Sequence, residues 1–405
     1  MTMTRRGFVS SSLGGALGMS LSAEASASPA GFAPRPVPDA TRIWDLPTPA
    51  LLVDLDALEF NLKKMADFYR PKKAKLRPHG KTHKSPLLAR KQIDLGAVGV
   101  CAAKVSEAEA FVEGGIADVL ITSPVVSREK FERVIALARK SPGVQIVVDQ
   151  PGGVRGLNEA AAAAGVKILV LIDLNVGSDR TGIEPGQPAL ELAREIAKSP
   201  SLRFAGIQAY AGHVMHQRGF EYRKQNSVKA LASAVETKRL LEKEGFEVPV
   251  LSVGGTGTYN IDCDIPGVTD VQVGSYLFMD VNYRNVGGAG GSIFDDFRPS
   301  LLVLATAISQ PVRGRITLDA GYKAFATDQE PPELLEVTGV PYRWGGDEHG
   351  ILEFKAPSRE IRLGDKLLLI ASHCDPTVNL YDRFYAFREE QVEEIWPVAG
   401  RGRSQ

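Results

Sequence analysis

Strand-like and helical segments alternate along the middle of this chain, and eight repetitions of the unit leave few folds open. The strand-like runs are short, apolar and rich in β-branched residues, as expected for parallel strands that are buried on both faces. They occupy 74–77, 97–101, 119–122, 145–149, 167–173, 204–210, 250–253 and 270–273. Helical patterns separate them at 86–91, 106–114, 128–140, 154–164, 189–198 and 222–245, and the seventh connection, 259–269, is short and poorly helical. Eight units predict an α/β fold with a closed (β/α)8 barrel of the TIM type, and an open doubly wound sheet is the structural alternative.

The alternation ends after Tyr276 and gives way to short strands. A glycine-rich loop at 286–291 precedes strand-like runs at 302–308, 315–319, 335–338, 351–354 and 366–370, with no long amphipathic helix between them. This pattern predicts a C-terminal antiparallel β domain over 286–405, after a barrel over 57–285. The segment 46–56 contains a strand that precedes the first helix, so we expect it to join the β domain. Asp56 is the predicted cap of that helix, 57–69.

The N-terminal segment resembles an export signal. Arg5 and Arg6 precede a weakly apolar run, and small-x-small cleavage patterns follow before residue 28. We therefore interpret 1–27 as a twin-arginine-type signal peptide and 28–45, rich in Pro and Ala, as a linker. The expected location is periplasmic, or cytoplasmic if this segment is an ordinary N-terminus. No later apolar run reaches the roughly 20 residues of a membrane-spanning helix. With 48 basic and 48 acidic side chains, the chain also has no charge excess that would favour nucleic acid.

A lysine follows the first predicted barrel strand, at the end where barrel enzymes carry their chemistry. Pro78 and Gly80 interrupt the strand, and Lys81 comes next. A desolvated lysine loses its proton easily and can form a Schiff base with a carbonyl compound or with pyridoxal 5'-phosphate (PLP). The alternative is a solvated basic loop, because several lysines crowd this stretch.

Glycine- and hydroxyl-rich turns follow the last two predicted strands. Thr256, Gly257 and Thr258 lie in one turn, and Gly274 and Ser275 lie in the other. Turns at these two positions of a barrel commonly bind phosphate through backbone N–H groups. A lysine on one side of the barrel mouth and a phosphate site on the other can hold PLP between them. Arg180 and Tyr210 follow strands between these two positions.

A second polar motif, 372–377, follows a predicted strand of the β domain. His373 and Asp375 alternate by two, so in an extended segment both side chains point to one face, with Cys374 on the other. One imidazole and one carboxylate are too few for a closed zinc site, and they suit Mg²⁺ or Mn²⁺ with several waters. The alternative is a polar surface turn. The three cysteines of the chain are widely spaced and form neither a disulfide framework nor a zinc pair.

Together these motifs resemble the D-threonine aldolase and D-serine dehydratase group of fold-type III PLP enzymes. The matching segments are PHGKTH (78–83), DRTG (179–182), QAYAGH (208–213), VGGTGT (253–258), VGSY (273–276) and SHCDPT (372–377). The resemblance extends from about Leu46 to about Pro397. It implies an alanine racemase-like barrel plus a β domain, a homodimer, and Lys81 as the lysine that holds PLP. It also implies Arg180 near the phenolic oxygen of PLP, Tyr210 near its ring, and His373 and Asp375 on a metal. The residues it implies around the cofactor phosphate are Thr256, Gly257, Thr258, Gly274 and Ser275, with Tyr276 also at the cofactor site.

One departure separates the two activities of this group. The zinc-dependent dehydratases carry a cysteine two residues after the metal histidine, whereas this chain has Asp375. A carboxylate favours Mn²⁺ or Mg²⁺ over zinc, so we expect an aldolase that cleaves D-3-hydroxy amino acids, such as D-threonine or 3-hydroxy-D-aspartate, to glycine and an aldehyde. His216 is the candidate base and His213 the competing one. The alternatives are a dehydratase acting on D-serine or D-threo-3-hydroxyaspartate, and a non-catalytic PLP carrier.

Overall fold

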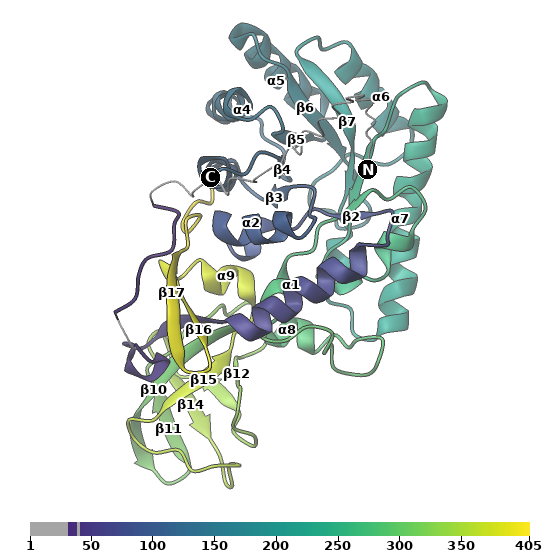
Figure 1. Cartoon of the computed structure of the whole chain (residues 1–405). Coiled ribbons are helices and arrows are strands. Elements are labelled where there is room, and N and C mark those ends of the chain that lie inside the picture. The colour runs from purple at the N-terminus through teal and green to yellow at the C-terminus, as the bar shows by residue number, and fades with distance from the viewer. Residues whose placement is uncertain (1–30, 39–40) are drawn as a thin grey trace, which may run out of the picture.

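The computed structural model describes residues 31–38 and 41–405, and within these the chain forms two sheets (Figure 1). The first sheet has eight parallel strands in the order β2-β9-β8-β7-β6-β5-β4-β3. Its strands are β2 (Lys75–Leu76), β3 (Val100–Ala102), β4 (Val119–Ile121), β5 (Gln145–Val148), β6 (Ile168–Asp173), β7 (Leu202–Ala209), β8 (Val250–Val253) and β9 (Asp270–Val271). A parallel bridge between His79 and Cys101 joins the two ends of the sheet. The prediction of a closed parallel barrel is confirmed.

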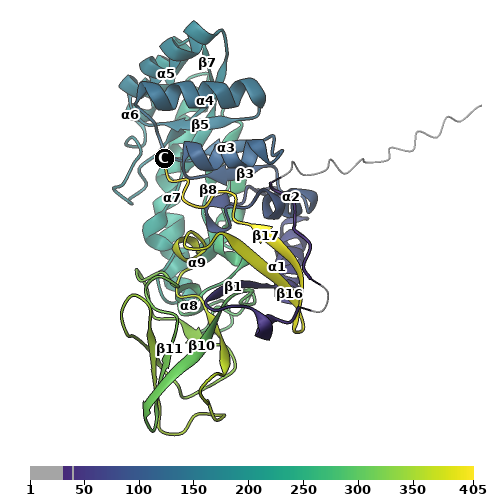
Figure 2. The ribbon, with the colours of Figure 1, turned by 90° about the vertical axis from the view of Figure 1, so that its left-hand side faces the viewer.

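The barrel helices follow their strands as predicted and cover the outside of the sheet (Figures 1 and 2). They are α2 (Pro86–Asp94), α3 (Val105–Glu113), α4 (Arg128–Lys140), α5 (Pro151–Ala164), α6 (Gln187–Ala197) and α7 (Phe220–Lys243). The connection after β8 contains single 3₁₀ turns at Thr256–Thr258 and Asp262–Asp264, and the short α8 (Val281–Arg284) follows the last strand. The first helix, α1 (Leu55–Tyr69), is capped by Asp54, whose carboxylate accepts a 3.0 Å hydrogen bond from Ala57 N. The prediction of Asp56 as the cap was wrong because the chain passes from strand to helix without a loop.

The second sheet has nine strands within the described residues and is mainly antiparallel. Its strands are β1 (Ala50–Asp54), β10 (Leu301–Val312), β11 (Arg315–Leu318), β12 (Glu333–Leu334), β13 (Tyr342–Trp344), β14 (Gly350–Glu353), β15 (Lys366–Ile370), β16 (Arg383–Arg388) and β17 (Gln391–Pro397). Strand β1 lies inside this sheet, antiparallel to β10 and parallel to β16. Its side chains Leu51, Leu52 and Val53 are fully buried. The first strand of the described chain therefore lies among strands from its C-terminal part.

Some predicted elements differ from the structure. The strand predicted at 335–338 lies earlier, at β12, and the sequence analysis did not identify β13, β16 and β17. The predicted signal peptide, 1–27, lies outside the described residues. The described part of the predicted linker follows β17: Arg35 N donates to Ile395 O (2.8 Å) and Ile43 N donates to Glu390 O (2.8 Å). These contacts fasten the segment along the edge of the β domain.

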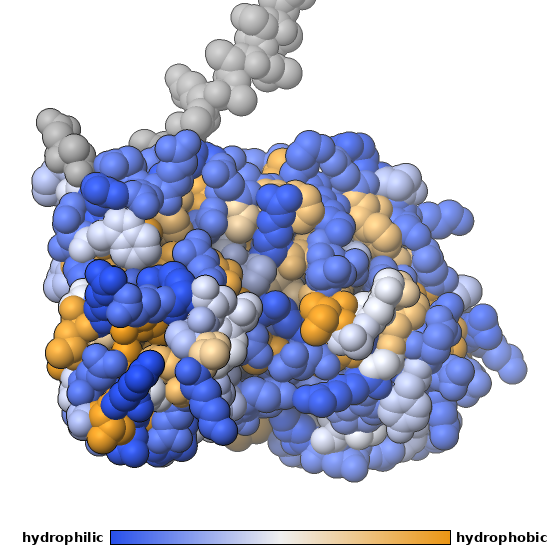
Figure 3. All heavy atoms as spheres, turned by 90° about the horizontal axis from the view of Figure 1, so that it is seen from below, coloured by the Kyte–Doolittle hydropathy of each residue, from blue (hydrophilic) through white to orange (hydrophobic). Residues whose placement is uncertain are grey.

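Hydrophilic side chains cover most of the face seen from the β-domain end, and apolar ones form small groups on it (Figure 3). The outer half of β10 is exposed and includes Ile308 and Val312. Isolated apolar side chains of this kind are ordinary on a protein surface. In the part of the chain that the structure describes, none of the helices combines the length and the apolar character needed to cross a membrane.

A buried arginine on α7 holds together three segments near the mouth of the barrel. Arg223 is 1% exposed. Its guanidinium donates hydrogen bonds to the carbonyl oxygens of Gly257 (2.7 Å), Gln217 (2.8 Å), Val286 (3.0 Å) and Gly287 (2.7 Å). These carbonyl groups belong to the turn after β8, the segment after β7 and the loop after α8. One side chain therefore satisfies polar groups that would otherwise be buried without partners.

Replacing this arginine should destabilise the fold. In Arg223→Leu the four carbonyl groups lose their donor, so we expect the free energy of unfolding to fall by more than about 3 kcal/mol, measured by urea denaturation. Lys224→Leu changes the exposed neighbouring residue on the same helix and should stay within about 0.5 kcal/mol of the parent protein. Equal stability of the two variants would contradict the role assigned to Arg223.

Candidate active site

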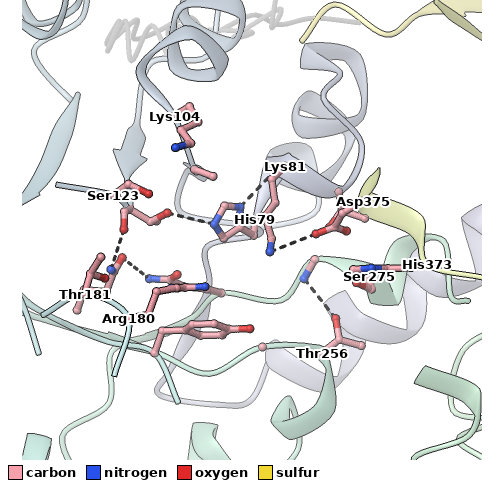
Figure 4. Close-up of a pocket in the computed structure, with 18 of the residues that line it drawn as sticks. His79, Lys81, Lys104, Ser123, Arg180, Thr181, Thr256, Ser275, His373 and Asp375 are labelled. Carbon is pink, nitrogen blue, oxygen red and sulfur yellow. Dashed lines mark hydrogen bonds and ion pairs between the residues drawn. The ribbon is translucent and has the colours of Figure 1, made fainter. Parts of the chain in front are cut away.

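A cavity of about 570 Å³ opens at the carboxyl ends of the barrel strands, where the β domain contributes the short helix α9 (Cys374–Val378) (Figure 4). Its volume is in the range of small-molecule sites. Residues predicted from distant parts of the sequence meet in its wall. They are Lys81, Arg180, Tyr210, His216, Thr256, Gly274, Ser275, His373 and Asp375.

Lys81 lies in a 3₁₀ turn, Gly80–Thr82, immediately after the barrel strand. The turn packs so closely on Phe111 that a Cβ on Gly80 would approach the ring to 2.2 Å. The Lys81 ammonium lies 3.2 Å from a carboxylate oxygen of Asp375 (Figure 4). This carboxylate raises the pKa of Lys81 and outweighs the desolvation that lowers it. Desolvation was predicted to dominate; instead, the neighbouring aspartate keeps the free lysine charged.

His373 and Asp375 both face the cavity, but not from an extended segment as predicted. His373 is the extended N-cap residue of α9, and Asp375 lies in the first turn of that helix. Burial alone would raise the pKa of Asp375, but Lys81 and His373 together hold it at about 2. Its second oxygen, Oδ1, is buried and has no hydrogen-bond partner among the described residues. The neighbouring Cys374 is fully buried outside the cavity wall, so its thiol is not placed to act there.

An aspartate that the sequence analysis missed orients the histidine. Asp328 Oδ2 lies 2.8 Å from His373 Nδ1, which leaves Nε2 for a ligand in the cavity. Asp328 is 45 residues away in a loop of the β domain, in a stretch with no recognisable spacing to His373. Only the fold brings the two side chains together.

The turns after β8 and β9 meet at the side of the cavity opposite Arg180. The hydroxyl oxygen of Thr256 accepts hydrogen bonds from the backbone N–H groups of Gly274 (3.3 Å) and Tyr276 (3.0 Å), so one side chain fixes both turns. Gly274 passes so near Thr82 that a Cβ would lie 2.5 Å from its hydroxyl oxygen. That hydroxyl is buried without a partner among the described residues. The close backbone and the orphaned hydroxyl form a cradle suited to a small anion.

Three residues predicted at the cofactor do not line the cavity. Gly257 packs against the backbone of Met215, where a Cβ would approach the carbonyl oxygen to 2.2 Å. The Thr258 hydroxyl is buried and donates to Asp262 (2.5 Å). Tyr276 is buried with its hydroxyl 3.0 Å from the Gln92 side chain. These residues support the turns on the side away from the cavity, because successive residues of a tight turn face in different directions.

Of the two histidines predicted as candidate bases, only His216 lines the cavity. Its ring centre lies 4.5 Å from that of Tyr283, and burial lowers its pKa, which favours the neutral form that a base requires. His213 lies outside the cavity wall, with Nδ1 3.3 Å from the Ser178 hydroxyl. His83 is fully buried beside Phe111. The geometry therefore favours His216 over His213.

Polar side chains from inside the barrel hold the floor of the cavity. The Arg180 guanidinium lies 5.6 Å from the ring centre of Tyr210, and the next residue, Thr181, donates to Asp173 (2.8 Å). Asp173 also accepts a 2.8 Å bond from Gln208. Burial raises the pKa of Asp173 to about 6. Several polar residues of the wall were not predicted because they lie within or just after strands whose inward positions were not assigned: His79, Lys104, Ser123, Gln208 and Gln272. Tyr283, in the short helix α8, was not predicted either.

A closed parallel barrel with this lysine, an anion cradle and an attached β domain defines an alanine racemase-like enzyme. The chain belongs to this family: residues 53–282 match the alanine racemase N-terminal domain. Residues 300–387 match the putative serine dehydratase domain. The predicted resemblance is confirmed.

Relatives with similar sequences include aldolases. A 3-hydroxy-D-aspartate aldolase of Paracoccus denitrificans is 37% identical over 362 residues, which cover 89% of this chain and 93% of the relative. A D-threonine aldolase of an Arthrobacter species is 37% identical over 355 residues, covering 88% and 93%. The crystal structure of D-threonine aldolase from Filomicrobium marinum superposes with a TM-score of 0.88 at 40% identity, covering 92% of this chain and all of that one. A D-threo-3-hydroxyaspartate dehydratase of a Delftia species is more distant, at 26% identity over 373 residues, 87% of this chain and 97% of the relative.

Membership of this family implies PLP as the cofactor. The cavity fits it: Lys81 is available for attachment, and the Gly274 and Thr256 turns suit the phosphate group. Arg180 and Tyr210 border the space between them. The orphaned Oδ1 of Asp375 and the oriented ring of His373 fit a divalent cation.

The titration of Asp173 should be visible in the stability of the protein. Because its folded-state pKa is about 6 against an ordinary value of 3.8, the unfolded chain ionises first as pH rises. Between pH 4 and pH 6 this group lowers the free energy of unfolding by up to about 3 kcal/mol, and the effect is constant above pH 6. Asp173→Asn cannot ionise, so its stability relative to the parent should be higher at pH 7.5 than at pH 4 in urea titrations. The same difference at both pH values would show that Asp173 ionises normally.

Proposed function

We propose that this protein is a PLP- and divalent-metal-dependent aldolase that cleaves D-3-hydroxy amino acids to glycine and an aldehyde. The observation that carries the proposal is the placement of Asp375 and His373 beside Lys81 in one cavity. This placement supports a metal-binding pair within reach of the hydroxyl group of a substrate whose amine is at the lysine. The aldolase relatives, similar over most of the chain, support the same reaction.

The metal that we propose is Mn²⁺ or Mg²⁺ rather than Zn²⁺. Among the described residues, no group of three or more His, Cys, Asp or Glu side chains is close enough to hold an ion. Two protein ligands with waters suit a hard cation. Bound there, the cation would make the substrate hydroxyl more acidic.

Different residues of the cavity have different roles in the proposed reaction. PLP, when bound, accepts the electron pair that remains on Cα after the Cα–Cβ bond breaks. His216 takes the proton of the β-hydroxyl, because its ring lines the cavity and its lowered pKa favours the neutral form. Lys81, kept charged by Asp375 when it is not attached to the cofactor, can return a proton to Cα to give glycine.

A dehydratase acting on D-serine or D-threo-3-hydroxyaspartate is the second candidate. The match of residues 300–387 to the putative serine dehydratase domain and the Delftia dehydratase favour it. It would use the same lysine and cavity but would expel the hydroxyl group as water. Asp375 argues against it. A thiolate prefers zinc, whereas a carboxylate favours Mn²⁺ or Mg²⁺.

Assembly and location complete the proposal. The family resemblance supports a homodimer, which light scattering of the purified protein tests directly.

The Arg5-Arg6 pair supports export by the twin-arginine route. Replacing both arginines with lysine should retain the protein in the cytoplasm of a host with this route, measured by cell fractionation. Periplasmic protein at the unchanged level would contradict the proposal.

The reaction itself is tested by its products. Purified protein with PLP and Mn²⁺ should convert D-threonine and 3-hydroxy-D-aspartate to glycine plus an aldehyde, identified by chromatography, and should leave the L-isomers unchanged. Formation of a 2-oxo acid and ammonia instead would identify a dehydratase.

Borohydride reduction of the holoenzyme should place the cofactor label on Lys81. Label on Lys75 or Lys84 would refute the role of Lys81.

Asp375 should be needed for metal-dependent turnover but not for cofactor attachment. Loss of a metal ligand removes stabilisation of the developing negative charge, so Asp375→Ala should lower kcat about a thousandfold while borohydride still labels Lys81. Asp375→Cys should shift the metal preference toward zinc. Cys374→Ala, outside the cavity wall, should retain metal activation. Loss of metal dependence in Cys374→Ala but not in Asp375→Ala would show that the metal site is misplaced.

A further inference from the structure

An amino acid substrate brings a carboxylate into the cavity, and the roles above leave one cationic side chain in the wall without a function. Lys81 is paired with Asp375, and Arg180 lies over the Tyr210 ring. Lys104 also lines the cavity, and its ammonium makes no ion pair or hydrogen bond with any other described residue. We propose, on the basis of the function proposed above, that Lys104 binds the α-carboxylate of the substrate.

The backbone around Lys104 is fixed, which places its side chain reproducibly at the rim. Lys104 is the N-cap residue of α3. The carboxylate of Glu107, one turn into that helix, accepts hydrogen bonds from the N–H groups of Ala103 (2.8 Å) and Lys104 (3.3 Å). An oriented cap of this kind fixes the start of a helix. The exposed side chain can therefore extend over the cavity from a rigid base.

The same carboxylate links Lys104 to the segment that carries Lys81. Glu107 forms a buried ion pair with Lys84, with Nζ and Oε1 2.6 Å apart. Lys84 lies three residues after Lys81 and adopts the left-handed conformation, with φ of 50°. The two lysines of the cavity, Lys81 and Lys104, are thus connected through a single buried pair. Their relative position follows from this connection rather than from the flexible ends of loops.

Charge in the cavity favours one orientation of the substrate. Lys104 and Asp375 lie on either side of Lys81 (Figure 4). A carboxylate is attracted by the Lys104 ammonium, whereas the side of the cavity formed by His373 and Asp375 is assigned above to the cation. With the substrate amine at Lys81 and its carboxylate at Lys104, the third substituent of Cα points toward Asp375 and His216. Such a three-point arrangement selects the configuration at Cα and places the hydroxyl group at the metal-binding pair.

The test measures binding of ligands that cannot be cleaved. Holoenzyme is titrated with D-alanine and with ethylamine, the same molecule without its carboxylate, and the change of the cofactor absorbance gives Kd. In Lys104→Met the Kd of D-alanine should rise about tenfold, as expected for loss of a partly exposed charge-assisted hydrogen bond, while the Kd of ethylamine stays unchanged. Lys104→Arg should recover most of the affinity for D-alanine. Lys140→Met, an exposed lysine at the end of α4, is the matched control and should change neither value.

Two results would overturn the assignment. An unchanged ratio of the two Kd values in Lys104→Met would show that another group binds the carboxylate. A rise in KM confined to 3-hydroxy-D-aspartate, with D-threonine unaffected, would show that Lys104 binds the side-chain carboxylate instead. Failure of the proposed function is distinguishable, because the binding titration requires no turnover, whereas the parent protein would then release no glycine.

Discussion

The ion pair between Lys81 and Asp375 joins the two parts of this molecule at the point where its chemistry lies. Lys81 comes from the barrel and Asp375 from the β domain, and their charged atoms are 3.2 Å apart. The Asp375 side chain is only 15% exposed, so its charge would be costly to bury without the partner that the barrel supplies. Asp280 strengthens the junction: its carboxylate accepts N–H bonds from Tyr283 in α8 (2.8 Å) and from Cys374 in α9 (2.9 Å). The cavity is therefore a product of both sheets.

The interior of the barrel is more polar than the apolar layers that usually fill such barrels. Near its floor, Arg77 pairs with Asp118 and lies 3.5 Å from Asp270. Above them, Gln272 donates to Ser252 (2.9 Å) and to Gln208 (3.2 Å), which is itself bonded to Asp173. Buried networks of this kind fix the orientation of their members. The amide groups at the floor of the cavity are consequently held in place before any ligand binds.

The sequence indicated elements whose pattern is local and strong. Helix α4 was predicted with its observed bounds because Ser127 caps it and its apolar side chains recur at the helical period. Strands β13, β16 and β17 were missed because charged residues interrupt short runs, and their pairing depends on distant strands. The five-residue helix α9 is too short to give a periodic signal, so it was predicted as an extended segment. Asp375 was therefore predicted correctly beside His373, but with the wrong local conformation.

The residues of the site also differ in whether a local sequence pattern identifies them. Lys81, Thr256 and Gly274 could be predicted because each follows a barrel strand at the end where all strands meet. Asp328 could not, since nothing in its local sequence shows which cavity its side chain reaches. Lys104 follows β3 at the same end of the barrel but was not singled out from the other lysines of the chain. Sequence motifs identify residues that follow strand ends. Tertiary contacts determine which of these residues line the same cavity.

The position of β1 has a consequence for how the molecule is made. Leu52 pairs with Leu302 in β10 and with Tyr385 in β16, so its neighbours are separated from it by most of the chain. On the ribosome this strand emerges early and must stay unpaired while the whole barrel is synthesised. Contacts between such distant segments slow folding, because the intervening chain must first be brought into order. Completion of the β domain, and with it the arrival of Asp375 beside Lys81, is expected to be the last step of folding, so a nascent or truncated chain would contain the lysine without its partner.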